Sequence, residues 1–443
     1  MNHRYARFFA ASTALTIGAL MSGPVLAAPP ADWSKVPTET IKLFYPGQAS
    51  YNWVRSSEHK RAFSKVERGE ACASCHEDEE HDIGDEIVSG ERLEPNPIKG
   101  KNGWVDLKVQ VAYDGENAYF RFQWPTQMDR PGQMHDYIRF DGQKWAFYGG
   151  PRSSEKVRSG KEPPLYEDRL AMMVDDGSVK NFAAHGCWVT CHNGMRDMPD
   201  EPTAAEVQAQ PLLGKNGLNE KDVRKYLPVS RTDDEASWDK TKSAEEIAQL
   251  KAHDGFVDLM QWRAARSNPV DMADDGYVLQ YRLFDEGKGP FSWNVDRKTM
   301  IPKYMFDAGK VGMKSLTVDE IGDPSKPYAL ILNENTAPYD ANGGWKEGDV
   351  LPGRLLSRAD ATGSAADNKE VKGTWANSTW TVVWTRKMNT GHPGDDKILE
   401  DGKAYTFGFA VHDDNVTTRF HFVGFPVSIG FGTDGDIKAT KVP

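Results

Sequence analysis

The four cysteines of this 443-residue chain fall into two short motifs, and each motif ends in Cys-His. The first reads Cys72-Ala73-Ser74-Cys75-His76, which matches the attachment motif of a c-type haem. In that chemistry the two thiols bond covalently to the haem vinyl groups, and the adjoining histidine becomes an axial ligand of the iron. A chain with this motif folds around a bound porphyrin, so we predict that Cys72, Cys75 and His76 hold a haem c.

The second motif reads Cys187-Trp188-Val189-Thr190-Cys191-His192 and has three residues between its cysteines instead of two. One extra residue can bulge outward while both thiols still reach the vinyl groups, so we predict a second haem c on Cys187, Cys191 and His192. The alternatives are a redox-active dithiol or a disulfide at the first motif, a short-loop disulfide at the second, and one zinc site shared by both. If the cysteines only formed disulfides, a histidine after the second cysteine of both motifs would be a coincidence. A shared zinc site would need a further cysteine or histidine at a regular spacing, and the sequence has none.

The first 27 residues have the features of a secretory signal peptide. Arg4 and Arg7 precede an apolar run from Phe8 to Leu20, and a small-residue site follows that ends at Ala27. We expect cleavage near Ala27 and export to the periplasm, with an uncleaved anchor as the alternative. No later run is long enough to span a bilayer and the mean hydropathy is −0.63, so we expect no stable membrane insertion.

The chain is acidic. Residues 1–27 carry two positive and no negative charges, so their removal takes the formal net charge from −11 to −13. This charge disfavours binding to nucleic acid or anionic lipid and favours docking to a basic patch on a redox partner protein. Solubility alone explains the same charge equally well.

Two regions differ in pattern. Residues 28–103 are polar, with a helix-like stretch from 58 to 67, and predict a small haem-binding segment that packs on the porphyrin. Residues 104–443 predict a β-sandwich, because short segments of alternating apolar and polar residues recur between turns. These segments are 105–111 and 118–124, which form a hairpin, then 379–384, 405–411 and 427–431. The fold class is therefore mainly β.

Two polar insertions interrupt the second region. The first covers about residues 195–252, where Ser243 and Glu246 predict a helix that opens with a capping box. The second covers about residues 359–372 and is small and polar, so we expect a surface loop without a role.

Several stretches in the region from about 104 to 435 carry a resemblance to a known family. They are 112–124, 167–171, 257–264, 380–386 and 409–421, in this order along the chain. Together they resemble the haem-binding (gamma-type) subunits of ethylbenzene dehydrogenase and dimethylsulfide dehydrogenase, which are partners of molybdenum enzymes. The resemblance implies a β-sandwich with one haem in its core and a place in a chain of redox cofactors.

This sequence departs from that family at the haem ligands. The relatives hold a b-type haem with a methionine and a lysine, without thioether bonds. Here His185 and Gly186 stand where the family has its methionine before a glycine, and the second Cys-His motif follows directly. His421 stands where the family's lysine is expected. The resemblance therefore implies haem at the same location with different ligands.

Both irons need a second axial ligand if the protein only transfers electrons. For the first haem, the candidates opposite His76 are His59, which we prefer because its helix-like approach lets it fold back over the motif, and His81. For the second haem, the candidate opposite His192 is His421, which we expect on a strand with Arg419 and Val423 facing the same way. His185 and His412 are the alternatives. Nearby methionines are further alternatives, namely Met172, Met173, Met195 and Met198.

The sequence thus predicts a periplasmic dihaem cytochrome c that exchanges electrons with a redox protein, either a molybdenum oxidoreductase or a quinol-linked, membrane-bound cytochrome. The alternative is a catalytic dihaem oxidoreductase, peroxidase-like or acting on a small nitrogen or sulfur substrate, with one open iron. A haem-based sensor is a third class. The sequence contains no nucleophile motif, phosphate-binding loop or metal-ligand helix.

Overall fold

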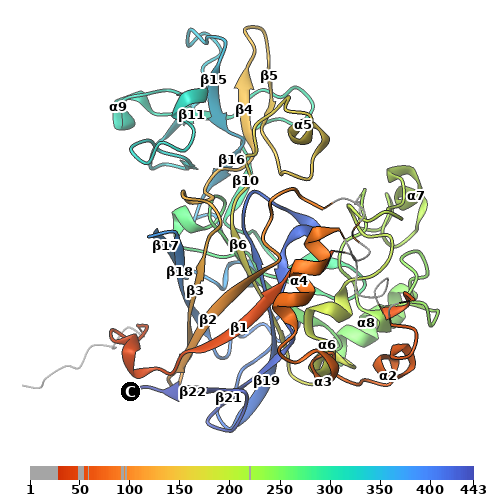
Figure 1. Cartoon of the computed structure of the whole chain (residues 1–443). Helices are drawn as coiled ribbons and strands as arrows, with labels where there is room; N and C mark the ends of the chain where they lie inside the picture. The colour runs from red at the N-terminus through yellow and green to blue at the C-terminus, as the bar shows by residue number, and fades with distance from the viewer. Residues whose placement is uncertain (1–27, 48–53, 58, 91–93, 95–96, 219–220) are drawn as a thin grey trace, which may run out of the picture.

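The structure is a computed structural model and describes residues 28–47, 54–57, 59–90, 94, 97–218 and 221–443. The signal peptide expected at 1–27 lies outside the described residues. Strands dominate the described part of the chain and helices are few and short, so the predicted mainly β fold is confirmed (Figure 1). None of the helices described has the length and apolar content that crossing a membrane requires.

In the described residues, thirteen strands form one hydrogen-bonded sheet. Its main path runs β17 (Glu370–Ala376), β18 (Thr379–Lys387), β3 (Asn117–Pro125), β2 (Trp104–Tyr113), β1 (Glu39–Phe44), β20 (Phe422–Val423), β19 (Lys403–His412), β6 (Arg169–Asp175), β7 (Val257–Arg263), β8 (Gly276–Val278) and β9 (Arg282–Phe284). Off this path, β21 (Val427–Phe431) pairs with β19, and β22 (Ile437–Lys441) pairs with β21 and β2.

The predicted hairpin is present as β2 and β3, which pair antiparallel with Val111 opposite Phe120. The alternation of side chains fixes this register, because a shift by one residue would turn the apolar set to the other face. The three C-terminal segments of alternating residues lie in β18, β19 and β21, as predicted.

The two halves of the sheet face each other across one apolar core. Phe120 on β3 lies 5.8 Å from Phe407 on β19 between ring centroids, and Phe122 lies 5.6 Å from Phe409. Further along, Trp262 on β7 contacts Trp380 on β18 at 4.9 Å. Because aromatic rings from both halves interdigitate, the layers form a sandwich that β1 and β20 join by hydrogen bonds.

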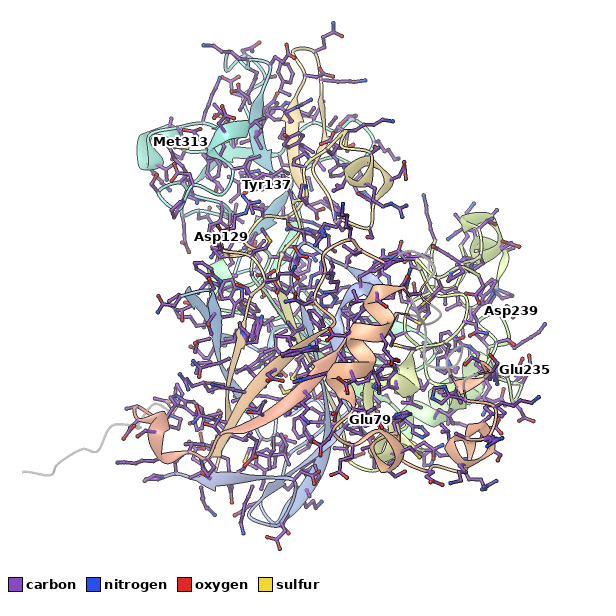
Figure 2. All side chains as sticks on the ribbon, in the orientation of Figure 1. Glu79, Asp129, Tyr137, Glu235, Asp239 and Met313 are labelled. Carbon is purple, nitrogen blue, oxygen red and sulfur yellow. The ribbon has the colours of Figure 1, made fainter. Side chains whose placement is uncertain are left out.

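A separate lobe stands at the top of Figure 1, with its own apolar core that includes Tyr137 and Trp145. Tyr137 and Met313 are labelled in this part of the molecule in Figure 2. The sequence analysis did not set this lobe apart. Its elements are β4 (Tyr137–Phe140), β5 (Trp145–Tyr148), α5 (Glu155–Arg158), β10 (Phe291–Trp293), β11 (Tyr304–Phe306), α9 (Ala308–Val311), β12 (Leu316–Thr317), η5 (Val318–Glu320), β13 (Leu330–Ile331), β14 (Thr336–Pro338), β15 (Asp349–Pro352) and β16 (Arg354–Leu356).

Most of the other helices lie beside the sheet, on the right in Figure 1. Glu79, Glu235 and Asp239 are labelled on this side in Figure 2. The elements there are α2 (Phe63–Glu67), α3 (Ala73–His76), α4 (Glu80–Ser89), α6 (Phe182–His185), η2 (Gly186–Thr190), α7 (Ala204–Ala209), η3 (Pro228–Ser230) and α8 (Ala244–Ala252). In the described residues, four further 3-10 turns lie elsewhere, at η1 (Trp33–Lys35), η4 (Asn268–Val270), η6 (Ser364–Ala366) and η7 (Thr418–Phe420).

Two local predictions have different outcomes. The capping box at Ser243 is confirmed, since the Ser243 hydroxyl accepts from the Glu246 amide and the Glu246 carboxylate accepts from the Ser243 amide. The expectation of a surface loop at 359–372 is wrong for part of this segment. There η6 is buried, and Asn368 is only 1% exposed. The Asn368 side chain hydrogen-bonds to Asp275 and Trp384 in the interior.

Candidate haem sites

The first motif forms a single helical turn. Cys72 immediately precedes α3, and the Cys75 and His76 amides both donate to the Cys72 carbonyl. Residues three and four apart on a helix share a face, so the turn presents both thiols and the imidazole to one side. His76 Nδ1 lies 2.9 Å from Glu79 Oε2. A carboxylate on Nδ1 fixes the ring orientation and leaves Nε2 for a metal.

This side faces a cavity of about 1080 Å³. The volume is at the upper end of the roughly 300–1,000 Å³ usual for cofactor sites, so a group of porphyrin size has room. Apolar and aromatic side chains wall it, and charged groups also reach its lining. The apolar wall comprises Phe44, Phe63, Val66, Ile83, Ile87, Val179, Trp188, Val189, Leu227 and Phe425, and the basic groups are Lys180, Arg231 and Lys242.

His59 lies near His76 in the lining of this cavity, with the two rings in a T-shaped arrangement. Both side chains line it, and their ring centroids are 5.9 Å apart. Two imidazoles on opposite sides of one metal, each with a nitrogen about 2 Å from it, have ring centres on the order of 6 Å apart. The separation of His59 and His76 therefore suits two axial ligands of a single iron.

Two other histidines lie in different surroundings. His81 is absent from the described lining of the cavity, since its ring stacks on Trp104 at 3.7 Å and its Nε2 lies 2.9 Å from Asp106 Oδ1. His185, considered as a ligand for the second haem, lies in the wall of the first cavity, with Nε2 3.0 Å from the Glu70 carbonyl.

The second motif lies in η2, at the surface of an apolar cluster against β19. Cys187 is buried, and Cys191 is partly exposed with the Lys225 amine 3.4 Å from its Sγ. His192 is buried and stacks on Tyr226 at 4.5 Å. Burial lowers the pKa of His192 to about 3, so at neutral pH its imidazole is neutral, the form that binds metals.

A hydrogen bond already occupies His192 Nε2, the nitrogen that would bind iron. This nitrogen lies 2.7 Å from the Val189 carbonyl. Coordination of iron by Nε2 therefore requires the ring to exchange this hydrogen bond for the metal.

His421 and His412 form a stacked pair, with ring centroids 4.9 Å apart and both side chains buried. His421 Nδ1 donates to the Thr418 carbonyl at 2.5 Å, which leaves Nε2 for a metal. Burial lowers the pKa of both histidines, and the Lys225 charge lowers each further. The Lys225 amine, which contacts Cys191, therefore acts electrostatically on both histidines. The segment after the second motif also contacts the turn before His421, since Arg419 donates to the Asp197 carbonyl at 2.7 Å.

The local structure around His421 corrects the expectation of a strand that His421 shares with Arg419. Arg419 lies in the turn η7 (Thr418–Phe420), and β20 begins only after His421. The strand is interrupted because Asp414, Asn415 and Thr418 adopt left-handed backbone conformations. The Arg419 guanidinium instead pairs with the buried Glu94 carboxylate at 2.6 Å.

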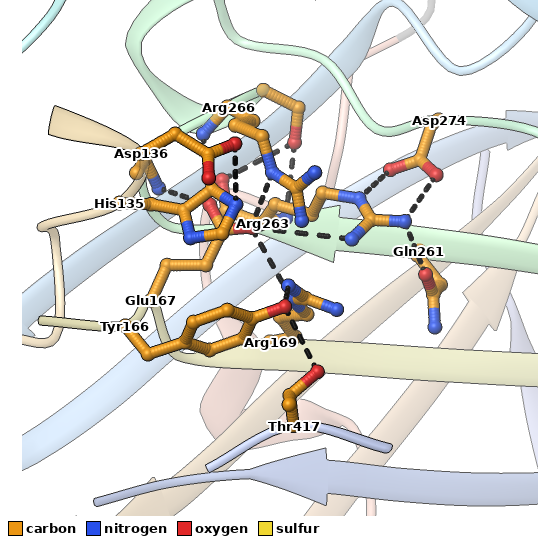
Figure 3. A network of polar contacts seen from close by, with 12 residues as sticks. His135, Asp136, Tyr166, Glu167, Arg169, Gln261, Arg263, Arg266, Asp274 and Thr417 are labelled. Carbon is orange, nitrogen blue, oxygen red and sulfur yellow. Dashed lines mark hydrogen bonds and ion pairs between the residues drawn. The ribbon is translucent and has the colours of Figure 1, made fainter. Parts of the chain in front are cut away.

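A buried polar network supports the segment before η7 (Figure 3). Glu167 accepts from Arg266 at 2.6 Å and from Arg169 on β6 at 3.2 Å. The Thr417 hydroxyl donates to the hydroxyl of Tyr166, which lies beside Arg169, at 2.8 Å. Because breaking a buried charge pair leaves an uncompensated charge, this network holds the chain that leads to His421 in place.

The two motifs are neighbours in space although they are far apart in sequence. Trp188 and Val189, inside the second motif, line the cavity that faces Cys72 and His76. The Cys72 amide donates to the Ala184 carbonyl, just before the second motif. Trp188 also stacks on Phe44 at 5.1 Å. The second motif therefore forms part of the wall of the first site.

Sequence reasoning missed three residues that the structure places at these sites: Glu79, Lys225 and Arg231. Glu79 follows His76 by three residues, and this spacing was available as a signal. Lys225 and Arg231 had none, because they approach through the folding of the 195–252 insertion.

The residues at the first motif fit haem, and the second motif supplies two further thiols and an imidazole. No disulfide joins the four cysteines, all of which the structure describes. The first motif has a cavity of suitable size and two histidines at a suitable separation. The second has neutral, buried histidines beside it, the donor type that haem iron accepts.

Comparison with known proteins points in the same direction. A family model described as ethylbenzene dehydrogenase matches residues 31–423. Cytochrome c-552 of Stutzerimonas stutzeri is 28% identical over 417 residues, which cover 94% of this chain and 92% of that protein. Cytochrome c-551 of Rhodocyclus tenuis is 27% identical over 171 residues, which cover 38% of this chain and 58% of that protein.

Proposed function

Since this chain belongs to the ethylbenzene dehydrogenase family, as its sequence resemblance indicated, we propose that it is a dihaem cytochrome c that carries electrons. Haem iron, when bound, supplies a one-electron couple between its ferric and ferrous states. The relatives named as c-type cytochromes support covalent haem in this chain. Cys72 and Cys75 would hold one haem, and Cys187 and Cys191 the other.

The observation that carries this proposal is the shared wall between the two motifs. Trp188 belongs to the second motif and lines the cavity of the first. Two haems held on either side of a shared wall are close enough to exchange electrons directly, as a carrier requires. The catalytic dihaem alternative differs in having one open iron, so the ligands of the two irons separate the two functions. The adjacency of Cys72 and the Ala184 carbonyl supports the same conclusion.

Each part of the chain has a defined task in this proposal. His76 and His59 would fill both axial positions at the first site, and Glu79 orients His76. His192 and His421 would fill those at the second. Phe44 and Trp188 exclude water from the side of the first cavity that they cover. With both positions filled, neither iron has an open site for a substrate.

We also propose where the protein works and with what partner. The N-terminal pattern with Arg4, Arg7 and a site at Ala27 supports export to the periplasm. The net charge of −13 without residues 1–27 supports docking to a basic surface on a redox protein. A molybdenum oxidoreductase or a quinol-linked, membrane-bound cytochrome is the partner we propose.

The proposal is tested by the spin state of the two irons. We expect the oxidised protein to be entirely low-spin, and we expect carbon monoxide to leave the spectrum of the reduced protein unchanged, because histidines fill both axial positions. Absorbance and electron paramagnetic resonance spectra measure this. Carbon monoxide binding at one of the two irons in the unmodified protein would contradict the carrier function and favour the catalytic alternative.

The variant His421→Ala is the positive control for that experiment. It keeps the thioether bonds and His192, so the second haem stays attached while its iron gains an open position that binds carbon monoxide. His185→Ala is the matched variant, and it should stay low-spin because His185 lies in the wall of the first cavity. The opposite result, with only His185→Ala becoming high-spin, would reverse the ligand assignment.

A further inference from the structure

A cluster of buried carboxylates lies apart from both Cys-His motifs. Asp258 is on β7, Asp275 directly precedes β8, and Asp396 lies in the connection between β18 and β19. One oxygen atom from each of these three residues lies within 4.8 Å of the others. Their exposed fractions are 0%, 3% and 2%. Asp285, directly after β9, is 6% exposed and lies beside Asp275, since its amide donates to the Asp275 carbonyl at 3.5 Å.

The described cations do not balance this charge. Arg386 donates to Asp258 Oδ2 at 2.9 Å and is the one cation in direct contact with the cluster among the described residues. The Lys397 amide also donates to Asp258, but its amine is 2.7 Å from Asp176 and is engaged there. The cluster therefore has four carboxylates and one direct positive partner, an arrangement that is costly away from water.

Several of its oxygen atoms lack hydrogen-bond donors. Within the described residues, Asp258 Oδ1 and both oxygens of Asp285 are buried without a hydrogen-bond partner. Neither oxygen of Asp396 has a hydrogen-bond partner within normal distance and angle. The Thr390 side chain is still close enough to lower the pKa of Asp396. Such acceptors are rare in folded proteins, because each one has lost its water without a replacement. These oxygens point to a missing positive ligand.

The surrounding groups hold the carboxylates in place. Asn368 donates to Asp275 Oδ2 at 2.5 Å, and the Gly276 amide donates to its Oδ1 at 3.0 Å. The neighbouring Asp395 is already bonded to the Ser364 hydroxyl at 2.7 Å. On the outer side, Asp367 and His392 form a pair at 2.6 Å and share a possible site with Asp396.

We propose that Asp258, Asp275 and Asp396, with Asp285 beside them, bind one divalent cation that prefers hard oxygen ligands, namely Ca²⁺. Ca²⁺ accepts six to eight oxygens at about 2.3–2.6 Å in flexible geometry, so its ligand atoms lie within roughly 5 Å of one another. The triad satisfies that limit. The ion joins the β7–β9 region to the β18–β19 connection, segments far apart in the sequence, and its role is structural.

Without the ion, protons would have to neutralise the cluster. Burial and the neighbouring carboxylates raise the pKa of Asp396 to about 8 and that of Asp285 to about 10. A bound divalent cation reverses this tendency and keeps the carboxylates ionised. Proton and cation are therefore competing ways of balancing the same charge, and measurement of bound metal distinguishes them.

The test uses the full-length haem-loaded protein, because chelation leaves covalent haem in place. The protein is first treated with EDTA and then incubated with Ca²⁺ or Mg²⁺. For the metal count, excess ion is removed and the metal that stays bound is measured by mass spectrometry. For the Tm measurement, the ion is left in the buffer. We expect one Ca²⁺ per chain. At a hundredfold excess over Kd, Tm should rise by about 3–5 °C in Ca²⁺, with an unchanged haem spectrum.

Matched variants separate the site from general charge effects. Asp396→Asn and Asp285→Asn should fold, because each relieves like-charge repulsion, and both should lose most of the Tm rise. Asp434→Asn removes the same charge at the surface and should respond as the unmodified protein does, since the Asp434 side chain is 98% exposed. Absence of retained metal and of any Tm shift in both ions would overturn the proposal, as would stabilisation by Mg²⁺ alone.

Discussion

Replacing Cys191 by alanine is expected to lower the haem absorbance per chain to about half, with the first haem still attached. In the proposed function, Cys191 would supply one of the two covalent bonds of the second site, and its Sγ contacts Lys225 instead of lining the first cavity. The converse variant, Cys75→Ala, should remove the first haem and spare the second. A pyridine haemochrome assay on purified protein, normalised to chain concentration, measures both.

The proximity of the two motifs makes this experiment demanding. Trp188 lines the first cavity, so a disturbed second motif puts the packing of the first at risk. Cys191→Ser, which conserves size and removes only the nucleophile, controls for packing and should behave as Cys191→Ala does. If all these variants lose both haems while their circular dichroism stays native, the two-site organisation is wrong.

Replacing His59 by alanine is expected to open the first iron while both haems stay attached. His59 and His76 have ring centroids 5.9 Å apart, and we assign them to opposite sides of one iron. His59→Ala should therefore give a high-spin fraction equal to about half of the haem and carbon monoxide binding in the reduced state. The midpoint potential of that haem should also shift, because one axial ligand changes.

His81→Ala is the matched control for His59→Ala. Both change one histidine of the N-terminal segment, but His81 stacks on Trp104 and bonds to Asp106. Its replacement should leave both irons low-spin and unreactive toward carbon monoxide. A high-spin signal in His81→Ala and none in His59→Ala would show that the N-terminal segment wraps the haem differently from the arrangement seen here.

The sequence predicted the elements whose cause is local. Alternation over 105–124 fixes a hairpin, and Ser243 with Glu246 fixes a helix start, because each depends on contacts a few residues apart. The motif at Cys72 likewise indicates haem attachment from five consecutive residues. These features follow from short-range rules that hold in any fold.

Features that depend on distant segments were beyond the sequence. The closeness of the two motifs follows from the folding of α6 and η2 against the N-terminal segment. The carboxylate cluster joins Asp258 to Asp396, and each alone is typical of a polar turn or strand residue. The strand expected through His421 is interrupted by residues in left-handed backbone conformations. The sequence pattern alone did not indicate these conformations.

The intact mass of the purified protein tests the central claim most directly. Our account predicts a chain that begins at or near Ala28 and carries two haem groups bound covalently through Cys72, Cys75, Cys187 and Cys191. A mass that corresponds to one haem, with the other cysteine pair oxidised to a disulfide, would contradict the dihaem account and confine the cytochrome to the first motif.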